Sequence, residues 1–370
     1  MQLLLNQLVY FGFFQGLLLL FIYSVSVKNR QRIDGYMAFF VGIVSIGLLG
    51  KVLYNAGVWN YNFRLISFSE LSALLFGPTI FLFTRSLLER TSFSKQDLIH
   101  YIPGVLYSIF VAIYFVIPSD DVIRGRAETG EMMRVIYMCH SVGLAVNIIY
   151  WMKALQVFRN VSLKLQNELS YEPQTRFLSN FLAVTGVCLL IWTTLLLTSF
   201  FGFEMLERNA RPYIWIVLTL VILFVTYYRM ISPQVLSIGP EPGRDAKKYT
   251  QSKLSVVDLA RLKGQLEALM NDKKPYLNSK LLKAELAEML GVSNPELARL
   301  LNENIGMNFF EYINYHRIKE FVALASTDRA QQFTFFGLAQ EAGFHSKTTF
   351  NKSFKKLMGT SPSVYFSKNL

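Results

Sequence analysis

Long apolar runs fill the first 230 positions of the chain, whereas polar residues dominate the remainder. Seven apolar segments follow one another, and each is close to the roughly 20 residues that a helix needs to cross about 30 Å of hydrocarbon. The pattern predicts a bundle of seven transmembrane helices. Their expected ranges are 4–26, 35–57, 66–88, 101–118, 133–155, 178–202 and 212–230.

Composition supports membrane spans in this first part. The chain has 52% hydrophobic residues, 31 phenylalanines and a mean hydropathy of +0.32, which are unusual values for a soluble protein. The first apolar run is too long for a cleaved signal peptide and lacks a basic region before it, so we expect a retained span. Cys139 and Cys188 both lie within apolar segments and read as small hydrophobic residues rather than a disulfide or metal pair.

The loops between the expected spans predict how the bundle is oriented. Lys and Arg number ten on one side and six on the other, and the side richer in these residues is normally cytoplasmic. We therefore expect a multi-pass protein of the bacterial cytoplasmic (inner) membrane. Its N-terminus would lie outside, and the chain after Arg229 would lie in the cytoplasm.

A polar linker broken by proline and glycine occupies residues 231–253 and separates the transmembrane domain, residues 1–230, from the rest. An amphipathic helix is expected at 254–274, because Leu259, Leu262, Leu266 and Leu269 recur at 3-4-3 spacing. This narrow seam has two interpretations. The helix packs on the neighbouring domain, or it pairs two subunits in a short coiled coil and so makes a homodimer.

The last hundred residues contain one structural unit written twice. Leu286-Ala287, Gly291, Leu297, Leu301 and Gly306 form the first copy. Leu338-Ala339, Gly343, Phe350, Phe354 and Gly359 repeat the pattern 52 or 53 residues later. In each copy the apolar spacing predicts two helices joined by a tight glycine turn, which is a helix-turn-helix whose second helix fits the major groove of DNA.

Capping residues mark where each second helix begins. Ser293 with Glu296 three residues later fits a capping box, and Ser346 can cap the second copy. Gly337 stands inside the first helix of the second copy, where glycine costs about 1 kcal/mol relative to alanine. With the aromatic pair Phe335-Phe336 beside it, we expect altered packing and a softer helix there.

The residues from Gly343 to Tyr365 resemble the signature of AraC-type transcription regulators. The resemblance rests on an opening Gly343-Phe344, on Phe350 and Phe354-Lys355, on Gly359, and on Ser361-Pro362 followed by Tyr365. It covers roughly residues 275–366 and implies a cytoplasmic double helix-turn-helix domain, with expected bounds 275–370. In that family a long helix, here about Phe309 to Ala325, joins the two units, which enter adjacent major grooves.

The resemblance also implies which residues contact bases. Carried onto this sequence, the positions are Asn294, Pro295, Ala298 and Arg299 in the first unit and Lys347, Thr348, Asn351 and Lys352 in the second. Arginine and lysine can pair with guanine, and asparagine with adenine, whereas Pro295 and Ala298 offer only apolar contact. Lys355 and Lys356 are expected to contact phosphate or solvent. Five lysines and no carboxylate between Gly343 and Leu370 suit a surface that meets phosphates.

Four polar residues within the expected spans are candidates for a ligand site. Lys51 and Glu70 fall near the outer ends of the second and third spans, and His140 and Asn147 share a face of the fifth. The alternative is structural: an ion pair between Lys51 and Glu70, and hydrogen bonds that hold helices together.

The sequence therefore predicts an all-α, membrane-bound regulator whose bundle senses an unknown signal molecule or membrane partner. Its expected partners are double-stranded promoter DNA, the lipid bilayer and RNA polymerase. We expect neither a cofactor nor enzymatic activity, because metalloprotease, nucleophile-elbow and P-loop motifs are missing. Two alternatives stay open. The bundle works as a transporter or enzyme with a regulatory DNA-binding domain, or the regulator is stored in the membrane and released by proteolysis near residues 239–252.

Overall fold

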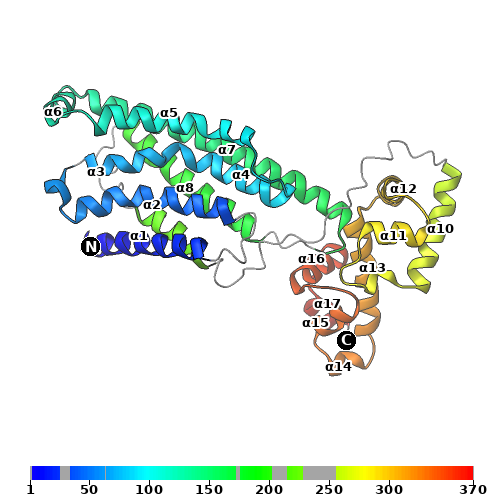
Figure 1. Cartoon of the computed structure of the whole chain (residues 1–370). Coiled ribbons are helices and arrows are strands. Elements are labelled where there is room, and N and C mark those ends of the chain that lie inside the picture. Colours follow the sequence, from blue (N-terminus) through cyan, green and yellow to red (C-terminus); the bar gives the residue numbers. More distant parts are fainter. Residues whose placement is uncertain are drawn as a thin grey trace. The chain divides into compact units, whose positions relative to one another are not determined.

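The computed structural model describes residues 2–25, 34–62, 64–171, 176–201, 215–227 and 256–369. These residues form helices without any β-strand, so the all-α prediction is confirmed for them. Figure 1 shows the helices in sequence colours. The chain divides into two compact units, one made of Met1–Arg159 and Thr175–Ile238 and the other of Asn160–Gln174 and Gly239–Leu370. The expected linker, 231–253, lies outside the described residues.

The first unit is a bundle of apolar helices, in which α1 packs on α2 and α2 packs on both η3 and α4. The described elements that begin in it are α1 (Gln2–Val25), α2 (Asp34–Asn55), η2 (Val58–Tyr61), α3 (Arg64–Ser67), η3 (Phe68–Leu75), α4 (Phe76–Glu89), η4 (Lys95–Tyr101), α5 (Ile102–Val111), η5 (Ala112–Val116), α6 (Asp120–Glu128), α7 (Glu131–Glu168), α8 (Arg176–Phe200) and a helix at Trp215–Tyr227.

Six described helices, not seven, are long and apolar enough to cross a membrane. The seventh expected span, 212–230, contains only the shorter apolar helix Trp215–Tyr227 among its described residues. The described part of this span is thus shorter than the ~20 residues that a crossing requires. The fifth span also differs from its expected range, because α7 continues from Glu131 to Glu168 instead of ending near residue 155.

The third expected span, 66–88, is a broken helix. It starts as the short α-helix α3, continues as the 3-10 helix η3 and returns to α-helical geometry at Phe76. Asn147 of α7 supports the change of geometry, because its amide accepts from Gly77 N–H at 2.7 Å and donates to the carbonyl of Ala73 at 2.9 Å. Ser108 of α5 donates to the carbonyl of Leu71. A helix that is broken within a membrane would require such partners from neighbouring helices.

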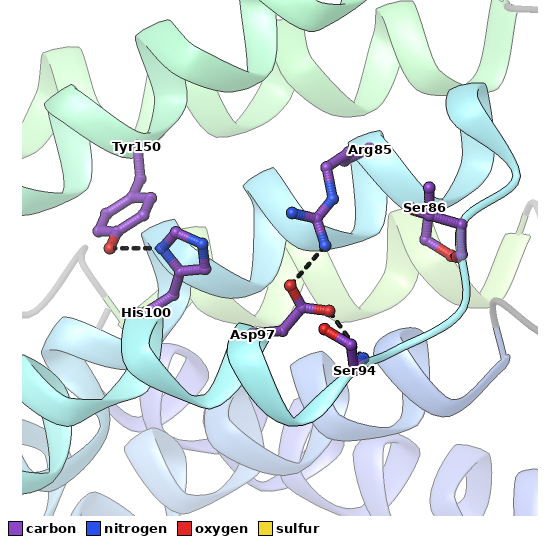
Figure 2. Close-up of polar contacts among 7 residues, drawn as sticks. Arg85, Ser86, Ser94, Asp97, His100 and Tyr150 are labelled. Carbon is purple, nitrogen blue, oxygen red and sulfur yellow. Dashed lines mark hydrogen bonds and ion pairs between the residues drawn. The ribbon is translucent and has the colours of Figure 1, made fainter.

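A polar cluster holds the turn between α4 and η4, as Figure 2 shows. The Asp97 carboxylate accepts from the Arg85 guanidinium at 2.6 Å and from the backbone N–H of Ser94 at 2.9 Å. The ring of His100 lies 3.1 Å from the Tyr150 hydroxyl, which joins η4 to α7. Asp97 is buried and its charge is paired with Arg85, so this cluster fixes a chain reversal.

The second unit begins with the last residues of α7 and contains the C-terminal helices. These are α10 (Val256–Asp272), η8 (Pro275–Leu277), α11 (Lys283–Leu290), α12 (Asn294–Arg299), η9 (Leu300–Ile305), α13 (Phe309–Ala325), α14 (Arg329–Gln332), α15 (Phe335–Glu341), α16 (Lys347–Met358) and α17 (Pro362–Asn369). Each of the two pairs α11–α12 and α15–α16 is a helix-turn-helix, as the repeat predicts.

Two hydrophobic clusters, one for each helix-turn-helix, share the helix α13. Phe309, Tyr312 and Ile313 belong to the first cluster, and Ile318 and Phe321 belong to the second. The helix therefore joins two cores, and its bounds are those predicted for the joining helix. In the described part of α10, the leucine seam is buried in the first cluster, so the structure shows the helix packing on its neighbouring domain.

Candidate nucleic-acid interface

The helix α16 presents the predicted second reading surface to solvent. Its side chains Lys347, Thr348, Asn351 and Lys352 are all exposed, and the pair at 347–348 lies one helical turn before the pair at 351–352, on the same face. The opposite face buries Phe350, Phe354 and Thr349. Ser346 begins the helix as predicted, because its hydroxyl accepts from Thr349 N–H at 3.1 Å. The predicted base readers of the second unit thus form a continuous, accessible surface.

Two further lysines extend this surface toward the end of α16. Lys355 and Lys356 are exposed, and Lys356 pairs with Glu311 near the start of α13 at 2.5 Å. The hydrogen bond from Lys356 lowers the pKa of the Glu311 carboxyl. The pair ties α16 to α13, while Lys355 stays on the solvent side.

The helix α12 offers a smaller and less basic surface. Pro295 is exposed, whereas Asn294, Ala298 and Arg299 are half-buried. The Arg299 guanidinium donates to Glu303 one turn later at 2.8 Å. The start of α12 is stabilised by a capping box, because the Glu296 carboxylate accepts from both the backbone N–H and the hydroxyl of Ser293. Glu296 is therefore a cap residue, as the sequence indicates.

The two glycine turns have the left-handed backbone that the sequence predicts, but their surroundings differ. Gly291 has φ +70° with no neighbouring atom where a Cβ would stand. Gly343 has φ +95°, and a Cβ there would lie 2.3 Å from the carbonyl oxygen of Tyr276. Gly337 lies in the first turn of α15, where Thr334 caps its N–H at 3.0 Å, so it does not interrupt the helix interior.

A fully buried arginine lies in the core of the second compact unit, beside the residues that follow α7. Arg317 of α13 donates to the carbonyl of Ser170 at 2.6 Å and to its hydroxyl at 3.0 Å, just beyond the end of α7. It also donates to the carbonyls of Tyr276 at 2.8 Å and Asn278 at 2.7 Å. Burial lowers the pKa of Arg317 to about 9, and these acceptors compensate for the lost hydration.

Further contacts stabilise residues 168–170 at the end of α7. Leu169 forms an antiparallel bridge with Leu282, and Ser170 N–H donates to the carbonyl of Leu281 at 3.2 Å. Glu168 pairs with the buried Lys283 at the start of α11. Sequence reasoning missed this cluster. The available signal was Arg317 itself, which stands four residues from both Ile313 and Phe321 and therefore occupies a core position of α13.

The four predicted ligand residues of the apolar bundle are placed differently from one another. Glu70 accepts from the Tyr107 hydroxyl and lies beside His140 Nε2, both at 3.2 Å, and these three side chains line a cavity. Asn147 also lines it, but its amide holds the backbone of the broken helix. Lys51 lies with its ammonium 5.2 Å from the ring centre of Tyr54. The structure thus brings Glu70 and His140 together.

Comparison with known proteins identifies the C-terminal domain. Residues 286–368 match the family described as a helix-turn-helix domain. They form an AraC-type helix-turn-helix domain. No curated protein and no solved structure matches the chain. The AraC-type domain supports a transcription regulator that binds double-stranded DNA.

Proposed function

We propose that this chain is a membrane-bound regulator that reads promoter DNA with α12 and α16 while its apolar bundle senses a signal and controls the reading. The base contacts come from the residues predicted above, with α16 as the principal reader. The bundle lies in the cytoplasmic membrane with its N-terminus outside, so that the AraC-type domain reaches DNA in the cytoplasm.

The observation that carries this proposal is the course of α7. The helix has 38 residues and contains an apolar window long enough to cross a membrane. Its residues from Asn160 onward belong to the unit that contains the AraC-type domain. The same helix therefore contains both an apolar, span-like sequence and, at its end, residues of the unit that holds the buried Arg317.

Control of DNA binding follows from what Arg317 contacts. This side chain binds Ser170 beyond α7 and the η8 segment near Tyr276, and α13 itself joins the two helix-turn-helix cores. A displacement of α7 would alter the acceptors of a buried charge, which carries a large energetic penalty. The signal then shifts the population between DNA-binding arrangements that already exist.

Genome-wide crosslinking and immunoprecipitation of the full-length protein, with a C-terminal epitope and parallel membrane fractionation, tests the proposal. We expect discrete promoter peaks from membrane-fraction protein. Peaks that accompany only a soluble fragment of roughly 14 kDa, as released by a cut near residues 239–252, would support the released form instead. Absence of peaks under all conditions would reject a promoter-binding role.

A pair of serine variants tests control through α7. Ser170→Ala removes a hydroxyl that accepts from Arg317, and Ser162→Ala removes one that has no hydrogen-bond partner among the described residues. We expect Ser170→Ala to change promoter occupancy severalfold at equal protein level, because one charge-assisted hydrogen bond contributes about 1.5–3 kcal/mol. Ser162→Ala should behave as wild type. Equal occupancy for both variants would argue against this route of control.

A further inference from the structure

The apolar bundle encloses a cavity whose role is not explained by DNA binding. Its volume is about 440 Å³, within the range of small-molecule sites. Phe40, Phe76, Ile136 and Trp192 contribute to its mainly apolar wall. A cavity of this composition suits a hydrophobic molecule, because transfer of apolar surface out of water is favourable.

One polar group in the cavity, the carboxyl group of Glu70, indicates what the polar end of the ligand must be. The carboxyl group of Glu70 faces the cavity, with the Tyr107 hydroxyl and His140 Nε2 at 3.2 Å. An amine or hydroxyl brought into this apolar space gains a charge-assisted hydrogen bond to such a carboxylate. A ligand carboxylate would instead meet like charge at short distance.

The backbone around the cavity supports a binding role independently of these side chains. Glu70 and Ala73 come from the 3-10 helix η3, and Phe115 comes from the π-helical turn η5. Mid-helix 3-10 segments often mark functional hinges, and π turns frequently occur at functional sites. In membrane proteins, discontinuous helices commonly form the binding site. Two of the helices that line this cavity depart from α geometry beside it.

We propose that this cavity binds an apolar molecule whose polar head is a hydrogen-bond donor, an amine or an alcohol, with Glu70 as the acceptor. This ligand is the signal of the regulator, so that part of the inference rests on the proposed function. A ligand in this cavity would lie beside the junction of η3 and α4. It would also contact α7, because His140 and Asn147 line the same cavity. The ligand is therefore bound by the helix that continues to the AraC-type domain.

Three probes with the same chain and different heads test the assignment: dodecylamine, dodecanol and dodecanoate. Full-length protein in phosphatidylcholine nanodiscs is titrated while tryptophan emission is recorded, because Trp192 and Trp215 line the cavity. We expect saturable changes with the amine and the alcohol, and at least tenfold weaker binding of dodecanoate. Equal responses to all three probes would show partition into the bilayer and overturn the assignment.

Two carboxylate variants provide the matched control. Glu70→Gln keeps the shape of the side chain but removes its charge, whereas Glu131→Gln makes the same change at a carboxylate that accepts from Tyr114 at 2.8 Å and does not line the cavity. Glu70→Gln should weaken dodecylamine at least tenfold, and Glu131→Gln should leave it within twofold. A larger effect on amine than on alcohol assigns a cationic ligand, and equal loss of both assigns a neutral one. Indistinguishable variants would overturn the proposal.

Promoter DNA binding by the same preparations separates the two proposals. Promoter binding without head-group selectivity overturns the cavity assignment alone. Head-group selectivity without promoter binding overturns the proposed regulator and leaves a ligand-binding membrane bundle.

Discussion

The two helix-turn-helix units share one sequence pattern, yet their second helices differ in charge and length. The helix α16 has twelve residues with Lys347, Lys352, Lys355 and Lys356 and no acidic residue. The helix α12 has six residues before it changes to the π-helical η9, and its Arg299 is paired with Glu303. A shared fold therefore does not imply equal contributions to DNA binding.

The two helix-turn-helix units therefore share a pattern of buried residues but differ in the surface that would face DNA. Buried positions such as Leu297 and Phe350 keep both units folded, because each fills its own cluster. The exposed positions carry no such requirement and are free to change. We infer that α16 contributes most of the attraction to phosphate and most of the base reading, while α12 fixes position and register.

The largest expected effect concerns the two glycine turns. In Gly343→Ala the new Cβ would meet the Tyr276 carbonyl at 2.3 Å while the residue keeps a left-handed φ. We expect a loss of about 3 kcal/mol or more in the free energy of unfolding of the second helix-turn-helix. Gly291→Ala has space around it and should lose only about 1 kcal/mol, the cost of the backbone conformation.

Pulse proteolysis of the full-length protein in increasing urea measures both variants, because cleavage follows the population of the unfolded domain. Similar losses at the two glycines would show that the crowding at Gly343 relaxes at little cost. The turns would then be equivalent, contrary to the comparison.

The next largest effect is on base reading. Lys347→Ala and Asn351→Ala remove exposed donors and acceptors from α16, so each should weaken binding to an identified promoter by about 1–3 kcal/mol. Arg299→Ala should weaken it by less than about 1 kcal/mol, because this guanidinium must give up Glu303 before it pairs with a base. Gel-shift titrations at one fixed salt concentration compare the three. A greater loss at Arg299 would reverse the order of the two readers.

Much of the AraC-type domain could be predicted because its signals are local. Ser346 caps α16 through Thr349 N–H at 3.1 Å, and the glycine turns at Gly291 and Gly343 have positive φ. The prediction that Gly337 softens its helix overlooked a different local signal. Thr334 stands three residues earlier, at a cap position, and places the glycine in the first turn.

The apolar bundle was predicted less well because hydropathy reports composition and not backbone geometry. The broken third span depends on Asn147, which lies 70 residues after Gly77 and supplies both an acceptor and a donor. The extension of α7 to Glu168 was missed for a related reason. Its last turns are polar, and their contacts with Lys283 and Arg317 come from residues more than 100 positions away.

A smaller effect tests whether the pair between Arg299 and Glu303 limits the first reader. Glu303→Gln removes a negative charge beside the DNA surface and weakens the hold on Arg299. We expect promoter binding to tighten by up to about fivefold at low salt and less at high salt, since exposed pairs contribute about 0.2–1 kcal/mol. The same titrations measure it. Weaker binding would mean that the pair orients Arg299 for reading.

The smallest expected effect concerns the link between α13 and α16. Glu311 has a lowered pKa in the folded protein, so its pair with Lys356 stabilises the fold above the ordinary carboxyl value of 4.5 and is lost as pH falls through the lower folded value. Lys356 is largely exposed, which limits the contribution to about 0.2–1 kcal/mol. Lys356→Met should therefore reduce stability slightly at pH 7, and this difference should shrink as the pH falls below 4.5. Lys355→Met, on the same helix, provides the control. A difference that does not shrink on acidification would mean that Lys356 stabilises α16 through its alkyl chain rather than its charge.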